Sequence, residues 1–154
     1  MKIYLLSFLL AFSQISYSQN QNTIDISGKW NGYRYQFNET KNSYQEDFIY
    51  TYKLSQEGTK VIGVVKISRT NGDYAEIAVR GFIENMKFYF EEYEVLNARR
   101  SNGIHWCLKT GVLDISINGL KEEVLKGNTR SVQEGYKGSC TGGYSYLTKK
   151  VLET

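Results

Sequence analysis

The chain has 154 residues, of which 41% are hydrophobic and 14% aromatic, and its formal net charge is +3 at pH 7. That length suits one domain with its own hydrophobic core. The small, evenly spread positive charge argues against nucleic acid or an anionic membrane surface as the partner.

Residues 1–18 are predicted to be a signal peptide. A basic start precedes the apolar run Ile3–Phe12, and the stretch Ser16–Ser18 supplies small residues for a cleavage site. The apolar run is too short to cross a bilayer as a mature helix, which needs about 20 residues. A buried N-terminal helix is the alternative. Cleavage leaves residues 19–154 as one domain of a secreted protein, with periplasmic and extracellular locations both open.

Runs rich in Val, Ile, Tyr, Phe and Thr recur along the rest of the chain, and proline is absent. These residue types favour the half-buried surface of a β-sheet. In chain order, the predicted strands are 30–37, 48–55, 61–68, 75–83, 87–96, 104–110 continuing to 117, 123–129 and 143–150. The pair Asn71-Gly72 indicates a tight hairpin between the third and fourth strands.

The sixth run changes face. Its apolar positions are even at Trp106 and Leu108 but odd at Leu113, Ile115 and Ile117. Because a strand alternates with period two, such a change needs an irregularity. A bulge or turn is therefore expected at Gly111.

Eight strands with short connections predict an all-β fold. We expect an antiparallel, up-and-down, eight-stranded barrel, which removes exposed sheet edges by closing on itself. A sandwich of two β-sheets is the alternative.

The sequence Gly28-Lys29-Trp30, at the entry to the first strand, resembles the G-x-W signature of calycins, the lipocalin and avidin group of eight-stranded barrels. The resemblance implies that Trp30 closes the bottom of the barrel beneath a basic residue from a late strand. Arg130, Lys149 and Lys150 are the candidates for that residue. With only two tryptophans, the chain departs from avidin-type biotin sites, and it ends near its last strand, without the helix usual in lipocalins.

Cys107 and Cys140 are predicted to form one disulfide, as an even number of cysteines in an exported chain suggests. A metal site is not expected, because two cysteines and the single His105 fall short of a four-ligand set. No cofactor-binding motif is present either.

Inward-facing aromatic side chains are the candidate ligand-binding surface. They are Tyr50, Tyr52, Phe88, Phe90 and Trp106, and the alternative is that they simply fill the core.

Two carboxylates, Glu92 and Glu94, continue the face of Phe88 and Phe90 toward the barrel mouth. With Arg80, or with the pair Arg99-Arg100, they would hold the polar end of a ligand; the alternative is that these charged residues are solvated.

These observations favour a secreted, monomeric, non-catalytic binding protein with a small apolar or amphipathic ligand in the barrel mouth. The alternative is a protein- or glycan-interaction module with a filled core and a tyrosine-rich outer face. An enzyme is not expected, because Glu92 and Glu94 are the only plausible acid and base and no catalytic set accompanies them.

Overall fold

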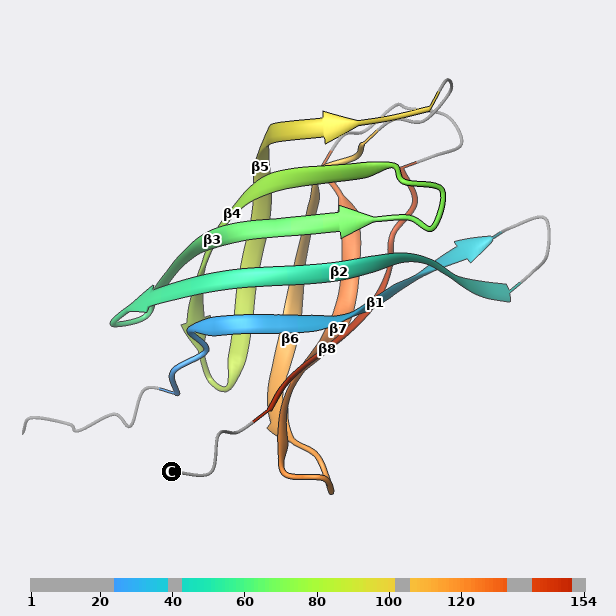
Figure 1. The fold of residues 1–154 in the computed structure, drawn as a ribbon. Helices are drawn as coiled ribbons and strands as arrows, with labels where there is room; N and C mark the ends of the chain where they lie inside the picture. The colour runs from blue at the N-terminus through green and yellow to red at the C-terminus, as the bar shows by residue number, and fades with distance from the viewer. Residues whose placement is uncertain (1–23, 39–42, 102–105, 133–139, 151–154) are drawn as a thin grey trace, which may run out of the picture.

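Eight antiparallel strands close into a barrel in a computed structural model that describes residues 24–38, 43–101, 106–132 and 140–150 (Figure 1). The strands are β1 (Gly28–Asn38), β2 (Ser43–Glu57), β3 (Lys60–Ser68), β4 (Tyr74–Glu84), β5 (Lys87–Arg99), β6 (Lys109–Ile117), β7 (Glu122–Ser131) and β8 (Gly143–Lys150). Each pairs with its neighbours in the chain, and β1 pairs with β8 to close the barrel. The predicted up-and-down barrel is confirmed, and the two-sheet sandwich is wrong.

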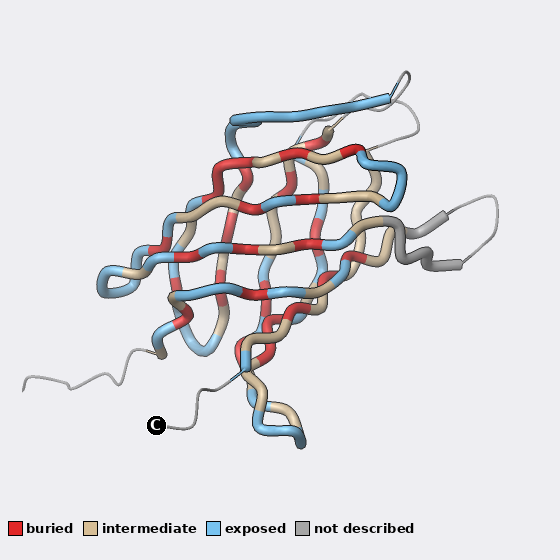
Figure 2. Tube along the Cα trace, in the orientation of Figure 1, coloured by how far each residue is buried: buried red, intermediate tan, exposed pale blue. Residues whose placement is uncertain are grey.

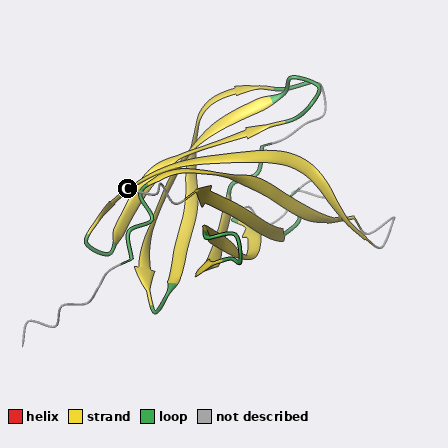
Figure 3. Cartoon of the chain, turned by 60° about the horizontal axis from the view of Figure 1, so that its bottom comes forward, coloured by secondary structure: helices red, strands yellow, loops and turns green. Residues whose placement is uncertain are grey.

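The barrel has two distinct ends. The β2–β3, β4–β5 and β6–β7 hairpins lie at one end, which we call the closed end, and the other connections lie at the mouth. Strands β1–β4 run across the view of Figure 1 and β6–β8 run steeply, while β5 bends from one direction into the other. Figure 3, turned by 60°, shows strands joined by loops, with no helix in the described part of the chain.

Alternation of burial along the strands builds the core, as the red segments in Figure 2 show. In β4, Ala75, Ile77, Val79 and Ile83 are all at most 7% exposed, whereas Arg80 between them is exposed. This is the period-two pattern of a sheet with one buried face. Ala78 is buried as well, at the point where the register with β5 shifts.

Trp30 closes the barrel at the closed end. The residue is fully buried, and its indole Nε1 donates a hydrogen bond of 2.8 Å to the carbonyl of Ile26. Lys149 lies over the indole ring, with Nζ 4.9 Å from the centroid, a contact worth about 0.5–2 kcal/mol. Of the three basic residues expected to contact Trp30, Lys149 is the one that lies over its ring. Gly28 precedes this contact with a φ of 115°, a conformation that favours glycine.

The expected course of the sixth strand is wrong at its start. β6 begins at Lys109, and Trp106–Leu108 lie outside any strand. Gly111 holds no bulge, because it pairs in register with Phe90 on β5 and Thr129 on β7. The change of face arises instead because Trp106 leaves the strand direction and packs edge-on against Phe48 at the mouth, with ring centroids 6.0 Å apart.

Ile117, expected on the inner face, is 71% exposed at the closed end, where β6 runs into the β6–β7 hairpin. His105 and the predicted signal peptide lie outside the described residues.

The disulfide between Cys107 and Cys140 is confirmed, with Cα atoms 5.5 Å apart. It ties the β5–β6 connection to the β7–β8 connection at the mouth. Such a bond is compatible with an extracellular protein.

Over the described residues, no helix has the length and apolar character needed to cross a membrane.

Candidate functional site

A cluster of polar side chains occupies the mouth half of the barrel interior. We call it the interior polar cluster; its members are Arg34, Tyr50, Tyr52, Glu92, Lys109 and Ser145. Every member is at most 3% exposed, although such groups are rarely buried without partners. The cluster draws on β1, β2, β5, β6 and β8, so it joins opposite walls of the barrel.

Arg34 is the centre of this cluster. Its guanidinium donates from Nη1 to the Tyr50 hydroxyl at 2.8 Å and from Nε to Ser145 Oγ at 3.2 Å. Its Nη2 lies 3.3 Å from Glu92 Oε1, forming an ion pair with both side chains fully buried. The guanidinium also lies over the Tyr50 ring, 4.3 Å from its centroid. All three guanidinium nitrogens are thus used by protein groups, as a buried charge requires.

The Glu92 side chain links β5 to β6 at the point where the backbone pairing of the two strands ends. The last registered pair is Glu91 with Thr110, and beyond it the Lys109 amide donates 2.9 Å to Glu92 Oε2. The other oxygen, Oε1, faces Arg34 and accepts from the Tyr52 hydroxyl at 3.4 Å. Both carboxylate oxygens are therefore engaged in holding the barrel together.

Burial and charge shift the ionisation of the cluster. Burial raises the pKa of Glu92, an effect that Arg34 opposes. Burial, followed by the charge of Glu92, raises the pKa of Tyr52 well above its usual range. For Lys109, burial and then the nearby Arg34 lower the pKa to about 8. The Lys109 ammonium donates to the carbonyl of Thr141 at 2.8 Å.

Stability is expected to rise with pH between about 8 and 10 because of Lys109. The unfolded chain keeps this proton up to the ordinary value of 10.5, whereas the folded protein releases it near 8. More protons are then bound in the unfolded state, so the free energy of unfolding increases, by at most about 1.4 kcal/mol per pH unit. Above about pH 10 the trend reverses, because tyrosines such as Tyr52 ionise first in the unfolded chain.

Urea denaturation across this interval measures the slope directly. In the variant Lys109→Met the rise should disappear. Parallel curves for the parent and the variant would contradict the assignment to Lys109.

The sequence-predicted site residues divide between interior and exterior. Tyr50, Tyr52, Phe88, Phe90 and Glu92 are all at most 3% exposed inside the barrel, where the rings pack on one another, for example Phe88 on Phe90 with centroids 5.7 Å apart. Trp106 is half-buried at the mouth.

Arg80 does not join Glu92 and Glu94 as expected. Its side chain is 61% exposed on the outer face, where it pairs with Glu91. Glu94 is exposed too. β5 leaves β6 after Glu91, its register with β4 shifts between Ala78 and Val79, and its residues from Tyr93 onward are exposed.

Three interior residues, Arg34, Lys109 and Ser145, were not predicted from the sequence. Arg34 lies four positions after the inward Trp30, and Lys109 is four before Leu113, so alternation places both on inner faces. Their charge makes burial implausible until the partners are known. These partners are far away in sequence: Glu92 for Arg34, and the Thr141 carbonyl for Lys109.

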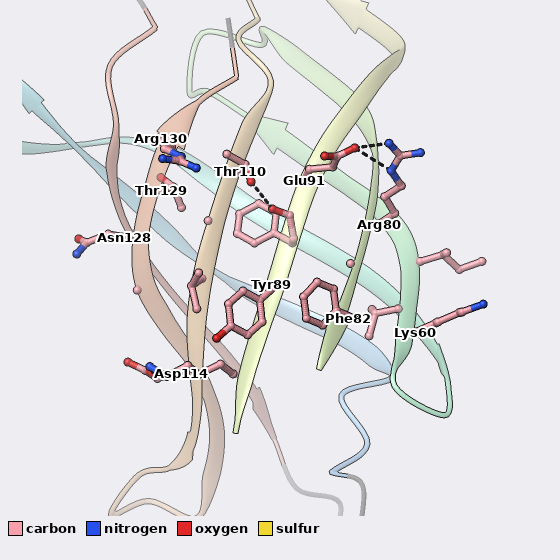
Figure 4. A pocket seen from close by; sticks show the side chains of 18 of the residues that line it. Lys60, Arg80, Phe82, Tyr89, Glu91, Thr110, Asp114, Asn128, Thr129 and Arg130 are labelled. Carbon is pink, nitrogen blue, oxygen red and sulfur yellow. Dashed lines mark hydrogen bonds and ion pairs between the residues drawn. The ribbon is translucent and has the colours of Figure 1, made fainter. Parts of the chain in front are cut away.

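A second candidate site lies on the outside of the barrel. We call it the outer groove; it has a volume of about 1110 Å³ and crosses strands β3 to β8 (Figure 4). Phe82 and Tyr89 lie side by side in its middle, stacked with ring centroids 4.9 Å apart and an interplanar angle of 6°. Outward residues of neighbouring strands continue its lining, among them Lys60, Ile62, Val112, Asn128, Arg130 and Tyr144.

Ion pairs flank the stacked rings on both sides. Arg80 and Glu91 pair on the mouth side, and Lys87 pairs with Asp114 at 2.7 Å on the closed-end side.

Within the described residues, no group of three or more metal-ligating His, Cys, Asp or Glu side chains is found. No protein-family model, curated protein or solved structure matches this chain.

Proposed function

We propose that this protein is a secreted, non-catalytic binding protein of the lipocalin-like barrel type, which engages its ligand in the outer groove. The observation that carries the proposal is the contrast between interior and exterior. The largest interior side chains, Trp30, Arg34, Tyr52 and Phe88, are completely buried, whereas the outer groove offers about 1110 Å³ beside a partly exposed aromatic pair.

The size and lining of the groove support binding of an extended ligand. Sites for small molecules usually enclose about 300–1000 Å³. A larger, open hollow lined by aromatic rings and charged side chains is typical of surfaces that hold partners through a few anchors. This is the interaction-module alternative of the sequence analysis.

The engagement of Glu92 supports a non-catalytic role. A general acid or base must reach a reacting proton, but both oxygens of Glu92 face protein donors inside the barrel. Glu94, its expected companion, is exposed and does not share the interior.

A ligand in the barrel mouth is the second candidate function. Two observations favour it. Trp106 Nε1 is buried with no hydrogen-bond partner among the described residues, and the interior polar cluster holds two cations, Arg34 and Lys109, against the single carboxylate of Glu92. A co-purifying mass that leaves on mild denaturation in native mass spectrometry would support this candidate.

Groove binding is tested by titrating saccharides, peptides and fatty acids into the ¹⁵N-labelled chain and recording amide spectra. We expect at least one chemical class to perturb the amides of Tyr89 and Val112, which lie in the groove. The double variant Phe82→Thr/Tyr89→Thr should lose this response, because it removes the aromatic pair.

A matched control is Tyr33→Thr/Ile49→Thr, which removes another exposed cross-strand pair from β1 and β2, outside the groove. Perturbations confined to Lys109 and Trp106 would reject the groove in favour of the mouth.

A further inference from the structure

The outer groove is a row of registered side chains that runs across the strands. Lys60 on β3 pairs with Phe82 on β4, Phe82 with Tyr89 on β5, and Tyr89 with Val112 on β6. Asn128 on β7 and Tyr144 on β8 form a further registered pair in the lining. Since neighbouring strands are 4.7–4.9 Å apart, six strands make a row of roughly 24 Å. Such a row suits a linear chain lying across the strands.

Aromatic surface and polar groups lie side by side in the groove. Phe82 is 47% exposed, and Tyr89 and Tyr144 are partly exposed. Thr110, Asn128 and the paired charges beside the rings supply donors and acceptors along the groove. Flat apolar faces bordered by hydrogen-bonding groups match the two surfaces of a sugar ring, whose C–H face is apolar and whose edge carries hydroxyls.

Charge in the groove is unbalanced toward the positive. Arg80 and Lys87 are neutralised by Glu91 and Asp114, respectively. Lys60 and Arg130 have no ion pair with any residue in the described ranges, and they lie toward opposite sides of the groove in Figure 4. Two separate exposed cations complement anionic groups carried along an extended ligand.

The backbone of the groove favours a saccharide over a peptide. One recurring way for an extended peptide to bind a sheet is to pair with a free strand edge. At the groove, β4 and β5 each pair on both sides, since Phe82 faces Lys60 and Tyr89, and Tyr89 also faces Val112. Within the described part of the chain, the edge of β5 that has no strand partner begins only after Glu91. A saccharide needs no main-chain partner.

We propose that the outer groove binds an acidic oligosaccharide, with sugar rings over Phe82, Tyr89 and Tyr144 and carboxylate or sulfate groups at Lys60 and Arg130. This inference rests on the proposed function, because it names the ligand class of the same groove.

The test is calorimetric titration of the full mature chain with hexasaccharides. The probes are uronic-acid oligomers (galacturonate, alginate and hyaluronate), a sulfated galactan oligomer, the neutral galactan and cellulose oligomers, and an acidic hexapeptide. We expect at least one acidic saccharide to bind about tenfold more tightly than its neutral counterpart, and added salt to weaken that binding.

Two variants separate the contributions of the rings and the charges. Phe82→Thr/Tyr89→Thr should lose binding of acidic and neutral saccharides alike. Lys60→Gln/Arg130→Gln should lose the preference for the acidic saccharide and its salt dependence. The control Tyr33→Thr/Ile49→Thr should bind like the parent.

Three results would overturn the inference: no saccharide bound at about 1 mM, equal affinity for acidic and neutral saccharides, or binding of the acidic peptide alone. Uronate and sulfate probes distinguish the two sources of negative charge. If saccharides fail while another class still perturbs Tyr89 and Val112, the ligand class is wrong and the groove stands. If no class perturbs these amides, the proposed function fails as well.

Discussion

Glu92→Ala is expected to lower the free energy of unfolding by about 3–5 kcal/mol, because it removes one partner of a buried ion pair. Arg34 would remain fully buried with its charge uncompensated, and the Lys109 amide would lose its acceptor. Since domains of this size are stable by only about 5–15 kcal/mol, the variant should be close to its folding limit. Urea denaturation monitored by tryptophan fluorescence and circular dichroism measures the loss.

The matched control is Glu94→Ala, two residues along the same strand but exposed. Its stability should stay within about 0.5 kcal/mol of the parent. The double variant Arg34→Met/Glu92→Leu should regain much of the loss, because replacing a whole buried pair by apolar groups removes the isolated charge. Equal losses for Glu92→Ala and Glu94→Ala would show that the buried pair has no special role.

Loss of the disulfide is expected to cost about 3–4 kcal/mol in the double variant Cys107→Ala/Cys140→Ala. The bond closes a loop with a sequence separation of 33, which restricts the unfolded chain by about that amount in the loop-entropy model. It also joins the two connections that frame the barrel mouth. Urea denaturation of the parent with and without reductant, beside the variant, measures the contribution.

Reduction of the parent should reproduce the stability of the double variant, and reductant should leave the variant unchanged. A change of less than about 1 kcal/mol in both would mean that strand pairing alone holds the mouth together. If the variant alone loses stability, replacement of the buried Cys107 side chain is responsible, and not the cross-link.

Most of the barrel was predictable from local pattern. The strand at 143–150 has the bounds expected, and the run around residues 75–83 alternates as a strand with one buried face. These features depend on neighbours in sequence, because period-two alternation and turn residues act over a few positions. The resemblance predicted a late basic residue over Trp30 and left Arg130, Lys149 and Lys150 as candidates, of which the structure has Lys149 over the ring.

The division of charged residues between interior and exterior was not predictable. From the sequence, Arg34 and Arg80 are equally expected to be exposed, yet Arg34 is fully buried and Arg80 is exposed. The difference lies in Glu92, which reaches Arg34 from the opposite wall across 58 positions of sequence. Similarly, Glu92 and Glu94 share a predicted face, but the register of β5 with β4 shifts between them, so that Glu92 is buried and Glu94 is exposed.

The sequence by itself therefore determined the strands, the barrel class and the pairing of two cysteines, since each follows from short-range periodicity or simple residue counts. Only the tertiary structure decided where the candidate sites lie. The aromatic pair Phe82 and Tyr89 belongs to one hairpin, but its flanks at Lys60 and Arg130 come from β3 and β7. A groove of this kind exists only when strand register and closure bring side chains from six strands onto one outer surface, and no local pattern specifies that alignment.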